Sequence, residues 1–422
     1  MAQLKDDCFA FGGELLQVDA ALNHIKSKLS VVCGAEDISI QDSYNRVLAE
    51  DVISTRDVPP HNNSAVDGYL VYFSDLNPEK STKLPITGRV AAGHVLRKKV
   101  KKGEAVKIFT GARIPDGSEG QPDTIFMEED CEVKGNLVTV PPGLKKGSNK
   151  RQKGEDIEKG KVILRKGRQL RPQEVGLIAS MGKSKVRVFE RLKVGVFSTG
   201  DEVRNPSSSV PDGCIFDSNR FAIIGLLKKL GCRVSDIGIL PDKQEIIAEA
   251  LVDAARSNNL IITSGGVSAG EEDHVREAVN LNGSIHFWRF AIKPGRPIAL
   301  GQVGQTAFIG LPGNPVAAMI TFMIFARPVV KLLSGILDIR AHKFPVKANF
   351  NYSKKIGRLE WVRSNLKVNN EGTVVAERFA NSGSGILTSM TDSDGLVEIG
   401  ENIKLVNKGD FVNFIPFSEI MQ

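Results

Sequence analysis

A chain of 422 residues is long enough for about three domains, each with its own hydrophobic core. Hydrophobic residues make up 41% of the chain and charged residues 25%, which excludes a disordered or fibrous protein. The formal net charge of +7 comes partly from basic stretches at 97–102 and 145–161, and it indicates an anionic partner. Aromatic residues are only 6% of the chain and form no stacking motif with the lysines, so we favour a small phosphorylated ligand over nucleic acid.

The spacing of the cysteines and the length of the apolar segments indicate the cellular compartment. The five cysteines are scattered and include no C-x-x-C pair, so the sequence predicts neither a disulfide framework nor a zinc site. The N-terminus lacks the apolar core of a signal peptide, and the longest apolar stretch, 316–326, is too short to cross a bilayer. We therefore expect a cytoplasmic protein with no membrane partner.

The first half of the chain predicts a β domain between two helical segments. Val18, Leu22 and Ile25 have helical spacing, and a loop rich in proline, asparagine and aspartate follows at 56–68. Short β-like runs separated by turns then predict a small β domain. These runs lie at 90–92, 105–109, 124–127 and 137–140. Helical spacing returns at 175–181 before a strand-like run at 186–189.

The second half predicts an α/β domain followed by a small β domain. Strand and helix patterns alternate from 192 to about 335, which favours βαβ units and a parallel, doubly wound sheet. One helix is expected to bury Phe221, Ile224 and Leu227, and another covers 243–257. From about 340 the chain alternates polar and apolar residues in short runs, which is typical of a β barrel or sandwich.

We therefore expect an α/β multidomain protein in four parts. They are an N-terminal helical and extended linker domain (1–55 and 156–190), an inserted β domain (56–155), a central α/β domain (191–338) and a C-terminal β-barrel-like domain (339–422).

The most informative stretch runs from 260 to 273. Its apolar, β-branched start predicts a buried strand, and the Gly/Ser-rich turn from Ser264 to Gly270 frees backbone N–H groups to face an anion. Glu271, Glu272 and Asp273 follow at once. A loop that binds phosphate and presents carboxylates is suited to a nucleotide-like ligand with a divalent cation, so the sequence predicts phosphate chemistry.

Other loops of the α/β segment are expected beside this one. The loops at 198–202, 241–242 and 293–297 all follow predicted strands, and ligands of open parallel sheets bind at the carboxyl ends of strands. Each loop alone could be an ordinary turn whose acidic residues offset a helix dipole. Lys293 and Arg296 flank a Pro-Gly turn and can point two cations at one oxyanion.

Seven motifs occur in an order that resembles the MoeA family of molybdopterin molybdenumtransferases over nearly the whole chain. They lie at 56–69, 109–112, 154–156, 198–202, 264–268, 293–297 and 311–315. The resemblance implies an enzyme that takes adenylylated molybdopterin and molybdate, hydrolyses the phosphoanhydride with Mg²⁺, releases AMP and places molybdenum on the dithiolene sulfurs. It also implies a cleft completed in a homodimer, an adenylyltransferase that delivers the pterin nucleotide, and partners in molybdoenzyme maturation.

The resemblance assigns roles to individual positions. Residues important for catalysis are Asp67, Thr110, Asp156, Glu202, Asp242 and Asp273, of which Glu202, Asp242 and Asp273 are also the expected metal ligands. Residues that bind the pterin nucleotide are Ser64, Thr199, Gly200, Ser264, Gly265, Gly266, Ser268, Gly270, Pro312, Gly313 and Asn314. Molybdate is expected at Lys293, Arg296, Ser384 and either Arg358 or Arg363.

One departure from the family and two other functions stay open. Ala317 stands where many members have a serine, so either Arg296 supplies the missing hydrogen bond or the oxyanion is held differently, with a preference for tungstate. The alternative functions are a gephyrin-like scaffold or a molybdopterin carrier, and a third alternative keeps only the resemblance of the α/β segment to the broader molybdopterin-binding fold. The charged loops count against a scaffold, and the long terminal β regions count against the α/β fold alone.

Overall fold

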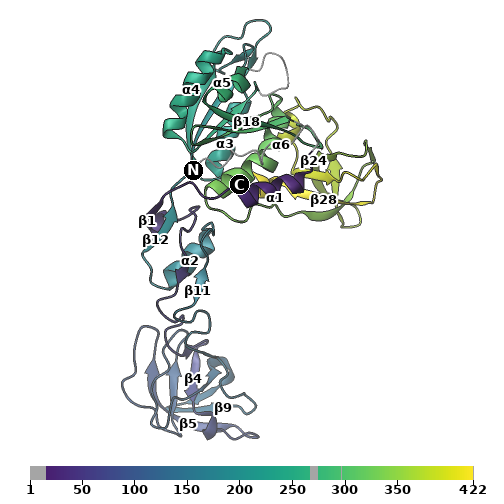
Figure 1. The fold of residues 1–422 in the computed structure, drawn as a ribbon. Coiled ribbons are helices and arrows are strands. Elements are labelled where there is room, and N and C mark those ends of the chain that lie inside the picture. The colour runs from purple at the N-terminus through teal and green to yellow at the C-terminus, as the bar shows by residue number, and fades with distance from the viewer. Residues whose placement is uncertain (1–15, 267–273, 296, 422) are drawn as a thin grey trace.

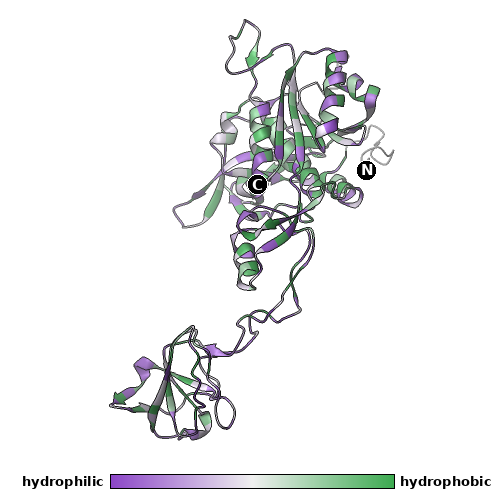
Figure 2. Ribbon diagram, turned by 90° about the vertical axis from the view of Figure 1, so that its left-hand side faces the viewer, coloured by the Kyte–Doolittle hydropathy of each residue, from purple (hydrophilic) through white to green (hydrophobic). Residues whose placement is uncertain are grey.

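The computed structural model describes residues 16–266, 274–295 and 297–421 and shows an elongated molecule. A large part made of the α/β segment and the C-terminal strands lies at one end, and a small β domain lies at the other (Figure 1). A narrow stem of short strands and one helix joins them. Helices and strands in both parts carry hydrophobic as well as hydrophilic residues, as amphipathic elements do (Figure 2).

The α/β part is built on a six-stranded sheet in the order β16-β13-β17-β21-β20-β18. The strands are β13 (Lys193–Thr199), β16 (Arg233–Leu240), β17 (Leu260–Ser264), β18 (Gly283–Arg289), β20 (Pro297–Val303) and β21 (Thr306–Leu311). The predicted parallel pairing is confirmed for β16, β13, β17 and β21. It is wrong for β20, which pairs antiparallel with both β18 and β21, because a two-residue turn after Val303 can join β20 to β21 only as a hairpin.

Helices cover both faces of this sheet, so the predicted doubly wound arrangement is confirmed. They are α3 (Asn219–Lys229), α4 (Gln244–Ser257), α5 (His274–Asn282), α6 (Pro315–Thr321) and α7 (Arg327–Leu333). Val196 and Ile262 pack in one core cluster with α3 and α6, whereas Phe197 and Ile261 pack in another with α4 and α5. The alternation of these strand residues between two cores is the period of two expected of a sheet buried on both faces.

The predicted face of α3 is wrong in part. Leu227 is buried, but Phe221 is 49% exposed, and the buried face carries Arg220 and Ile223 instead. The reason is an ion pair, because the Arg220 guanidinium points inward to Asp217 and turns its side of the helix toward the sheet.

The apolar segment after 315 is longer than the sequence analysis predicts. Helix α6 continues through a π-helical segment, Phe322–Ala326, into α7, so Pro315–Leu333 is 19 residues long and by length and composition alone could cross a membrane. In the structure 83% of its apolar window is buried, and Phe325 stacks on Phe290 with ring centroids 3.8 Å apart. It packs here as the central helix of the core.

The C-terminal segment forms the predicted barrel. Its elements are β22 (Phe344–Ala348), β23 (Tyr352–Ser353), β24 (Leu359–Val368), β25 (Val374–Arg378), α8 (Thr388–Thr391), β26 (Gly395–Ile399), β27 (Leu405–Val406), β28 (Phe411–Pro416) and α9 (Phe417–Ile420). The order β24-β25-β22-β28-β26 closes because β26 also pairs with β24. Strand β19 (Ile292–Lys293) of the preceding segment joins the barrel edge in parallel with β24.

The N-terminal half contains the stem and the remote β domain. The stem pairs β1 (Ala35–Ser39) with β12 (Lys185–Phe189) and β2 (Val52–Ile53) with β11 (Val162–Leu164), beside α2 (Pro172–Ser180). The sheet of the remote domain consists of β4 (Gly68–Val71), β5 (Thr82–Val90), β6 (Ala105–Ile108), β7 (Thr124–Met127), β8 (Glu132–Lys134) and β9 (Leu137–Val140). Strand β5 ends at Val90, so the run predicted at 90–92 is its end rather than a strand of its own.

Helix α1 (Val18–Lys28) does not pack on the stem, although the sequence analysis groups the two. Its buried residues, Val18, Ala21 and Ile25, belong to the large core cluster that includes α7. The domain boundaries themselves stay a prediction.

The start of α2 depends on one buried carboxylate. Glu174 has a side chain only 4% exposed and accepts hydrogen bonds from the Arg171 side chain at 2.7 Å and from the Arg171 backbone N–H at 3.1 Å. Arg168 donates to the same carboxylate. These contacts, with Arg171 first, lower the pKa of Glu174 from 4.5 to about 2.

This shift predicts a loss of stem stability in acid. Because the pKa of Glu174 is lower in the folded state, its contribution is fully present above about pH 4.5 and is lost as the pH falls toward 2. Over that range we expect the free energy needed to open α2 locally to fall by about 2 kcal/mol. This value allows for the solvent around the half-exposed arginines, which weakens the ion pairs. Amide hydrogen exchange of α2 measures it, and Glu174→Gln should remove most of the pH dependence. An unchanged pH dependence in that variant would contradict the assignment.

Candidate active site

The main cleft of the large part lies between the carboxyl edge of the α/β sheet and the barrel. Its volume is about 680 Å³. Its lining comes from strand ends, from the β19 turn and from two barrel loops, namely Thr199, Gly200, Glu202, Asp242, Gly265, Gly266, Ile292, Lys293, Pro294, Gly295, Pro312, Gly313, Asn314, Ala317, Arg358, Ser382 and Ser384. The prediction that separate strand-end loops converge is therefore confirmed for the residues of this lining.

Glu202 and Asp242 form the acidic wall. They follow β13 and β16, which are parallel neighbours, so both carboxylates reach the same edge of the sheet. Thr199 donates a hydrogen bond from Oγ1 to Asp242 Oδ1 at 3.2 Å. At Gly200, φ is +139° and a Cβ would lie 2.6 Å from Glu202 Oε2, so glycine allows the Glu202 side chain to fold back against the loop.

The glycine turn after β17 is tightly packed. A Cβ at Gly266, where φ is +64°, would lie 2.5 Å from Val275 Cγ2 and 2.8 Å from Thr199 Cγ2. The Gly265 N–H donates to Leu311 O at 3.1 Å, which extends the pairing of β17 with β21 to the edge of the cleft.

Asn219, at the start of α3, connects the two glycine-containing turns of the cleft. Its Nδ2 donates to Ser264 Oγ at 2.8 Å and to Gly313 O at 2.6 Å, and Ser264 Oγ donates to Pro312 O at 3.0 Å. One amide therefore holds the turn after β17 at a set distance from the turn after β21.

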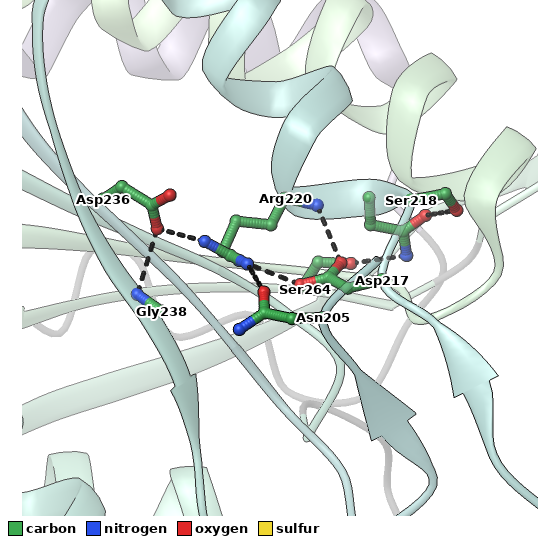
Figure 3. A network of polar contacts seen from close by, with 8 residues as sticks. Asn205, Asp217, Ser218, Arg220, Asp236, Gly238 and Ser264 are labelled. Carbon is green, nitrogen blue, oxygen red and sulfur yellow. Dashed lines mark hydrogen bonds and ion pairs between the residues drawn. The ribbon is translucent and has the colours of Figure 1, made fainter. Parts of the chain in front are cut away.

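A buried ion-pair network fixes the first turn of α3, which carries Asn219 (Figure 3). Arg220 Nε donates to Asp217 Oδ2 at 2.9 Å, and its other nitrogens reach Asp236 on β16 and Asn205. Asp217 also accepts the Arg220 backbone N–H at 3.1 Å and so caps the helix. The side chains of Arg220 and Asp217 are 4% and 2% exposed, and the contact of Arg220 with the half-exposed Asp236 links α3 to β16.

Lys293 and Arg358 supply the basic wall. Lys293 lies on β19 directly opposite Glu360 on β24, and its Nζ is 3.5 Å from Glu360 Oε2. Arg358 is presented by the loop before β24, whose carbonyl at Arg358 accepts from Lys354 Nζ at 2.5 Å. Burial lowers the pKa of Lys354. Two cations thus reach the cleft from elements joined by one strand pairing.

Arg358 and Arg363, the two alternatives for the oxyanion contact, lie in different places. Arg358 lines the cleft. Arg363 is 4% exposed and donates to the carbonyls of Asn381 and Gly383 at 3.2 and 3.1 Å. Its contacts hold the loop that presents Ser384, whose own carbonyl accepts from the Val316 N–H at 3.0 Å.

The predicted residues of the N-terminal half lie away from this cleft. Asp67 and Thr110 are together, since Asp67 Oδ1 accepts from the Thr110 N–H and hydroxyl, each at 2.7 Å. These bonds lower the pKa of Asp67, the backbone bond most. Neither they nor Ser64 and Asp156 line the cleft. The remote β domain, which carries the pair, lies at the far end of the molecule (Figure 1).

Several predicted residues lie outside the described part of the chain, namely Ser268, Gly270, Asp273 and Arg296. The expected metal trio can therefore be followed only at Glu202 and Asp242. Among the described residues no group of three histidine, cysteine, aspartate or glutamate side chains could hold a metal. The two carboxylates of the acidic wall nevertheless fit a hard cation such as Mg²⁺, which takes one or two carboxylates and completes its shell with water and phosphate oxygens.

Sequence analysis missed the residues that position the site. Asn219 and Lys354 lie in no segment that was expected to bind a ligand. Glu360 lies between the two expected oxyanion contacts, Arg358 and Arg363, but no role was predicted for it. Asn219 directly follows Asp217 and Ser218 at the start of a predicted helix, where polar side chains are common, so nothing in the local sequence singles it out. For Glu360 and Lys354, only the pairing of two distant strands reveals the contact.

Comparisons with known proteins agree over nearly the whole chain. Residues 16–182 match the model "MoeA N-terminal region (domain I and II)", 195–332 match "Probable molybdopterin binding domain", and 345–417 match "MoeA C-terminal region (domain IV)". The chain is 36% identical to the molybdopterin molybdenumtransferase of Haemophilus influenzae, covering 96% of this chain and 100% of the relative. It is 32% identical to that of a Nostoc species, covering 73% and 72%.

A solved structure has the same fold. The molybdopterin biosynthesis moeA protein from Pyrococcus horikoshii OT3 superposes with a TM-score of 0.80 at 28% identity, covering 96% of this chain and 100% of that one.

Removal of the Asn219 amide should loosen both glycine-containing turns. In Asn219→Ala, Ser264 Oγ and Gly313 O lose a shared donor, so we expect about 1–2 kcal/mol less protection at the Gly265 amide in hydrogen exchange. Ser218→Ala is the matched control, since within the described residues its hydroxyl makes a single long hydrogen bond, to Asn219 Oδ1 at 3.5 Å. Equal exchange in both variants would contradict the role of Asn219.

Proposed function

Because the chain belongs to the MoeA family of molybdopterin molybdenumtransferases, which act in molybdenum cofactor biosynthesis, we propose that its cleft joins molybdate to adenylylated molybdopterin and releases AMP. The observation that carries the proposal is the separation of charge within one cleft. Glu202 and Asp242 lie on the edge of the sheet, and Lys293 and Arg358 lie on the side of the barrel.

The two glycine-containing turns suit the pterin nucleotide. Gly266 and Gly313 lie at the ends of parallel strands, where glycine backbone lets a phosphate approach closely, and Gly265, whose N–H is held by Leu311 O, lines the same edge. Asn219 and Ser264 hold these turns without entering the cleft lining themselves. The phosphate end of the substrate would therefore lie over the sheet edge, beside the carboxylates.

The basic wall suits molybdate as the second substrate. A tetrahedral dianion needs several donors and compensating charge, which Lys293 and Arg358 supply, with hydroxyls at Ser382 and Ser384. The loop that carries Ser384 is held by Arg363 from behind and by the Val316 N–H at the start of α6. The oxyanion would thus lie between α6 and the barrel.

Hydrolysis of the phosphoanhydride requires water to attack phosphorus and the bond to AMP to break. Mg²⁺, held by Glu202 and Asp242 with Asp273, would neutralise charge on the phosphate oxygens when bound. Thr199 holds Asp242 by a hydrogen bond, which keeps its carboxylate turned toward the cleft. No side chain is assigned as a covalent nucleophile.

The remote β domain supports a proposal of a homodimer. Asp67 and Thr110 form a hydrogen-bonded pair that cannot reach the cleft of its own chain in this arrangement. A second copy would bring this pair, with Ser64 and Asp156, to the cleft. We further propose a cytoplasmic location, delivery of the pterin nucleotide by an adenylyltransferase, and transfer of the product to molybdoenzyme maturation.

Asp242→Asn tests the acidic wall. We expect about 10²–10³-fold lower turnover, because the variant loses a preorganised charge where the phosphoanhydride would lie. Purified protein is incubated with adenylylated molybdopterin, Mg²⁺ and molybdate, and AMP is measured. Asp253→Asn, an exposed aspartate of α4 paired with Arg256, is the matched control. Wild-type AMP release by Asp242→Asn would refute the assignment.

Ala317→Ser tests the oxyanion side. Ala317 lines the cleft, so an added hydroxyl there would supply one more donor and should tighten molybdate binding about fivefold, the effect of one hydrogen bond. Calorimetric titration with molybdate and with tungstate measures the change and shows which oxyanion gains. An unchanged dissociation constant for both would place the oxyanion away from α6.

A further inference from the structure

Behind the cleft lies a second, small cavity that shares three residues with it. Lys293, Pro294 and Ser382 line both spaces, whereas Glu360 and Tyr352 line only the rear one. The Lys293 side chain therefore separates the cleft from a buried carboxylate. The Lys293 side chain can therefore meet a ligand on the side of the cleft, while on the side of the small cavity it contacts the protein.

We propose that Glu360 is a positioning residue that holds the Lys293 ammonium group at the oxyanion end of the cleft, an inference that rests on the proposed function. Glu360 Oε2 lies 3.5 Å from Lys293 Nζ, and the two residues face each other in the parallel pairing of β19 with β24. The backbone pairing sets the distance between the two strands, and the ion pair sets where the long lysine side chain ends.

The carboxylate is the rigid member of this pair. The Glu360 side chain is 6% exposed, whereas that of Lys293 is 49% exposed. Tyr352 donates its hydroxyl to the same Glu360 oxygen at 2.6 Å, and the Arg378 guanidinium lies 5.5 Å from the centre of the tyrosine ring. Burial, together with this hydrogen bond, raises the pKa of Tyr352, so its hydroxyl stays a donor. A flexible ammonium group is thus held against a fixed acceptor.

The charges around the rear cavity support the same role. Its lining includes Lys293, Arg363 and Arg378, and Glu360 is the one carboxylate among its lining residues in the described part of the chain. Without Glu360, the ammonium group of Lys293 would face two guanidinium groups and would be driven toward solvent. Glu360 therefore keeps the cation at the boundary between the two spaces, where a dianion in the cleft meets it.

Glu360→Gln is the primary test, measured with the full-length protein. Removal of the charge should raise the KM for molybdate about tenfold and weaken molybdate binding in calorimetry by a similar factor. The KM for adenylylated molybdopterin and kcat at saturating molybdate should stay within about twofold. Tyr352→Phe keeps the carboxylate but loses its donor, so it should raise the KM for molybdate about threefold.

A double-mutant cycle shows whether Glu360 acts through Lys293. In a Lys293→Ala background, Glu360→Gln should have no further effect on molybdate binding, because the side chain it positions is gone. The matched control is Glu398→Gln. Glu398 lies in the same barrel, pairs with Lys343 and accepts Trp361 Nε1 at 3.2 Å, but it does not line the cleft. It should leave the KM for molybdate unchanged.

The outcomes separate this inference from the proposed function. An unchanged KM for molybdate in Glu360→Gln, or an equal rise with and without Lys293, would overturn the positioning role. Equal weakening of both substrates would mean that Glu360 only supports the fold, which also overturns it. If the wild-type protein binds no molybdate and releases no AMP, the proposed function itself fails.

Discussion

The parallel pairing of β19 with β24 is the interaction on which the cleft depends. It places Lys293 of the α/β segment opposite Glu360 of the barrel and brings the loop with Arg358 to the same wall. Without this pairing the acidic edge of the sheet would have no basic wall facing it. The barrel also shares a core cluster with the α/β part, since Trp361 of β24 belongs to the same cluster as Phe325 of the π-helical segment.

A second group of contacts makes the sheet edge stiff. Asn219 connects the turns after β17 and β21, and the buried pair of Arg220 with Asp217 fixes the helix start that carries it. A ligand that binds through backbone N–H groups needs those groups in place beforehand, since ordering loops on binding costs affinity. The cleft is thus preorganised on its acidic side by hydrogen bonds and on its basic side by a strand pairing and an ion pair.

The residues of the cleft and the pair of Asp67 with Thr110 lie at opposite ends of the molecule. The cleft holds the glycine turns, Glu202, Asp242 and the basic wall, whereas the pair of Asp67 with Thr110 lies on the remote β domain. The stem between them is stabilised by short strand pairings and by Glu174, whose carboxylate is held by two arginines. Only the carboxylate of this ion-pair cluster is buried, since the side chains of Arg168 and Arg171 are about half exposed.

The sequence by itself determined the strands and helices with strong periodicity, the barrel, the helices on both sides of the sheet, and the convergence of strand-end loops. It could do so because apolar periodicity and Gly/Ser turns are local signals. It did not predict the antiparallel β20, the inward face of α3, or the roles of Asn219 and Glu360. The face of α3 depends on Arg220, which pairs with the nearby Asp217 and with Asp236 of a distant strand, and the role of Glu360 depends on β19 lying beside β24. The reversal of β20 depends on the short turn that joins it to β21 as a hairpin. Only the tertiary structure decided them, because burial and hydrogen-bond partners are set by packing rather than by local spacing.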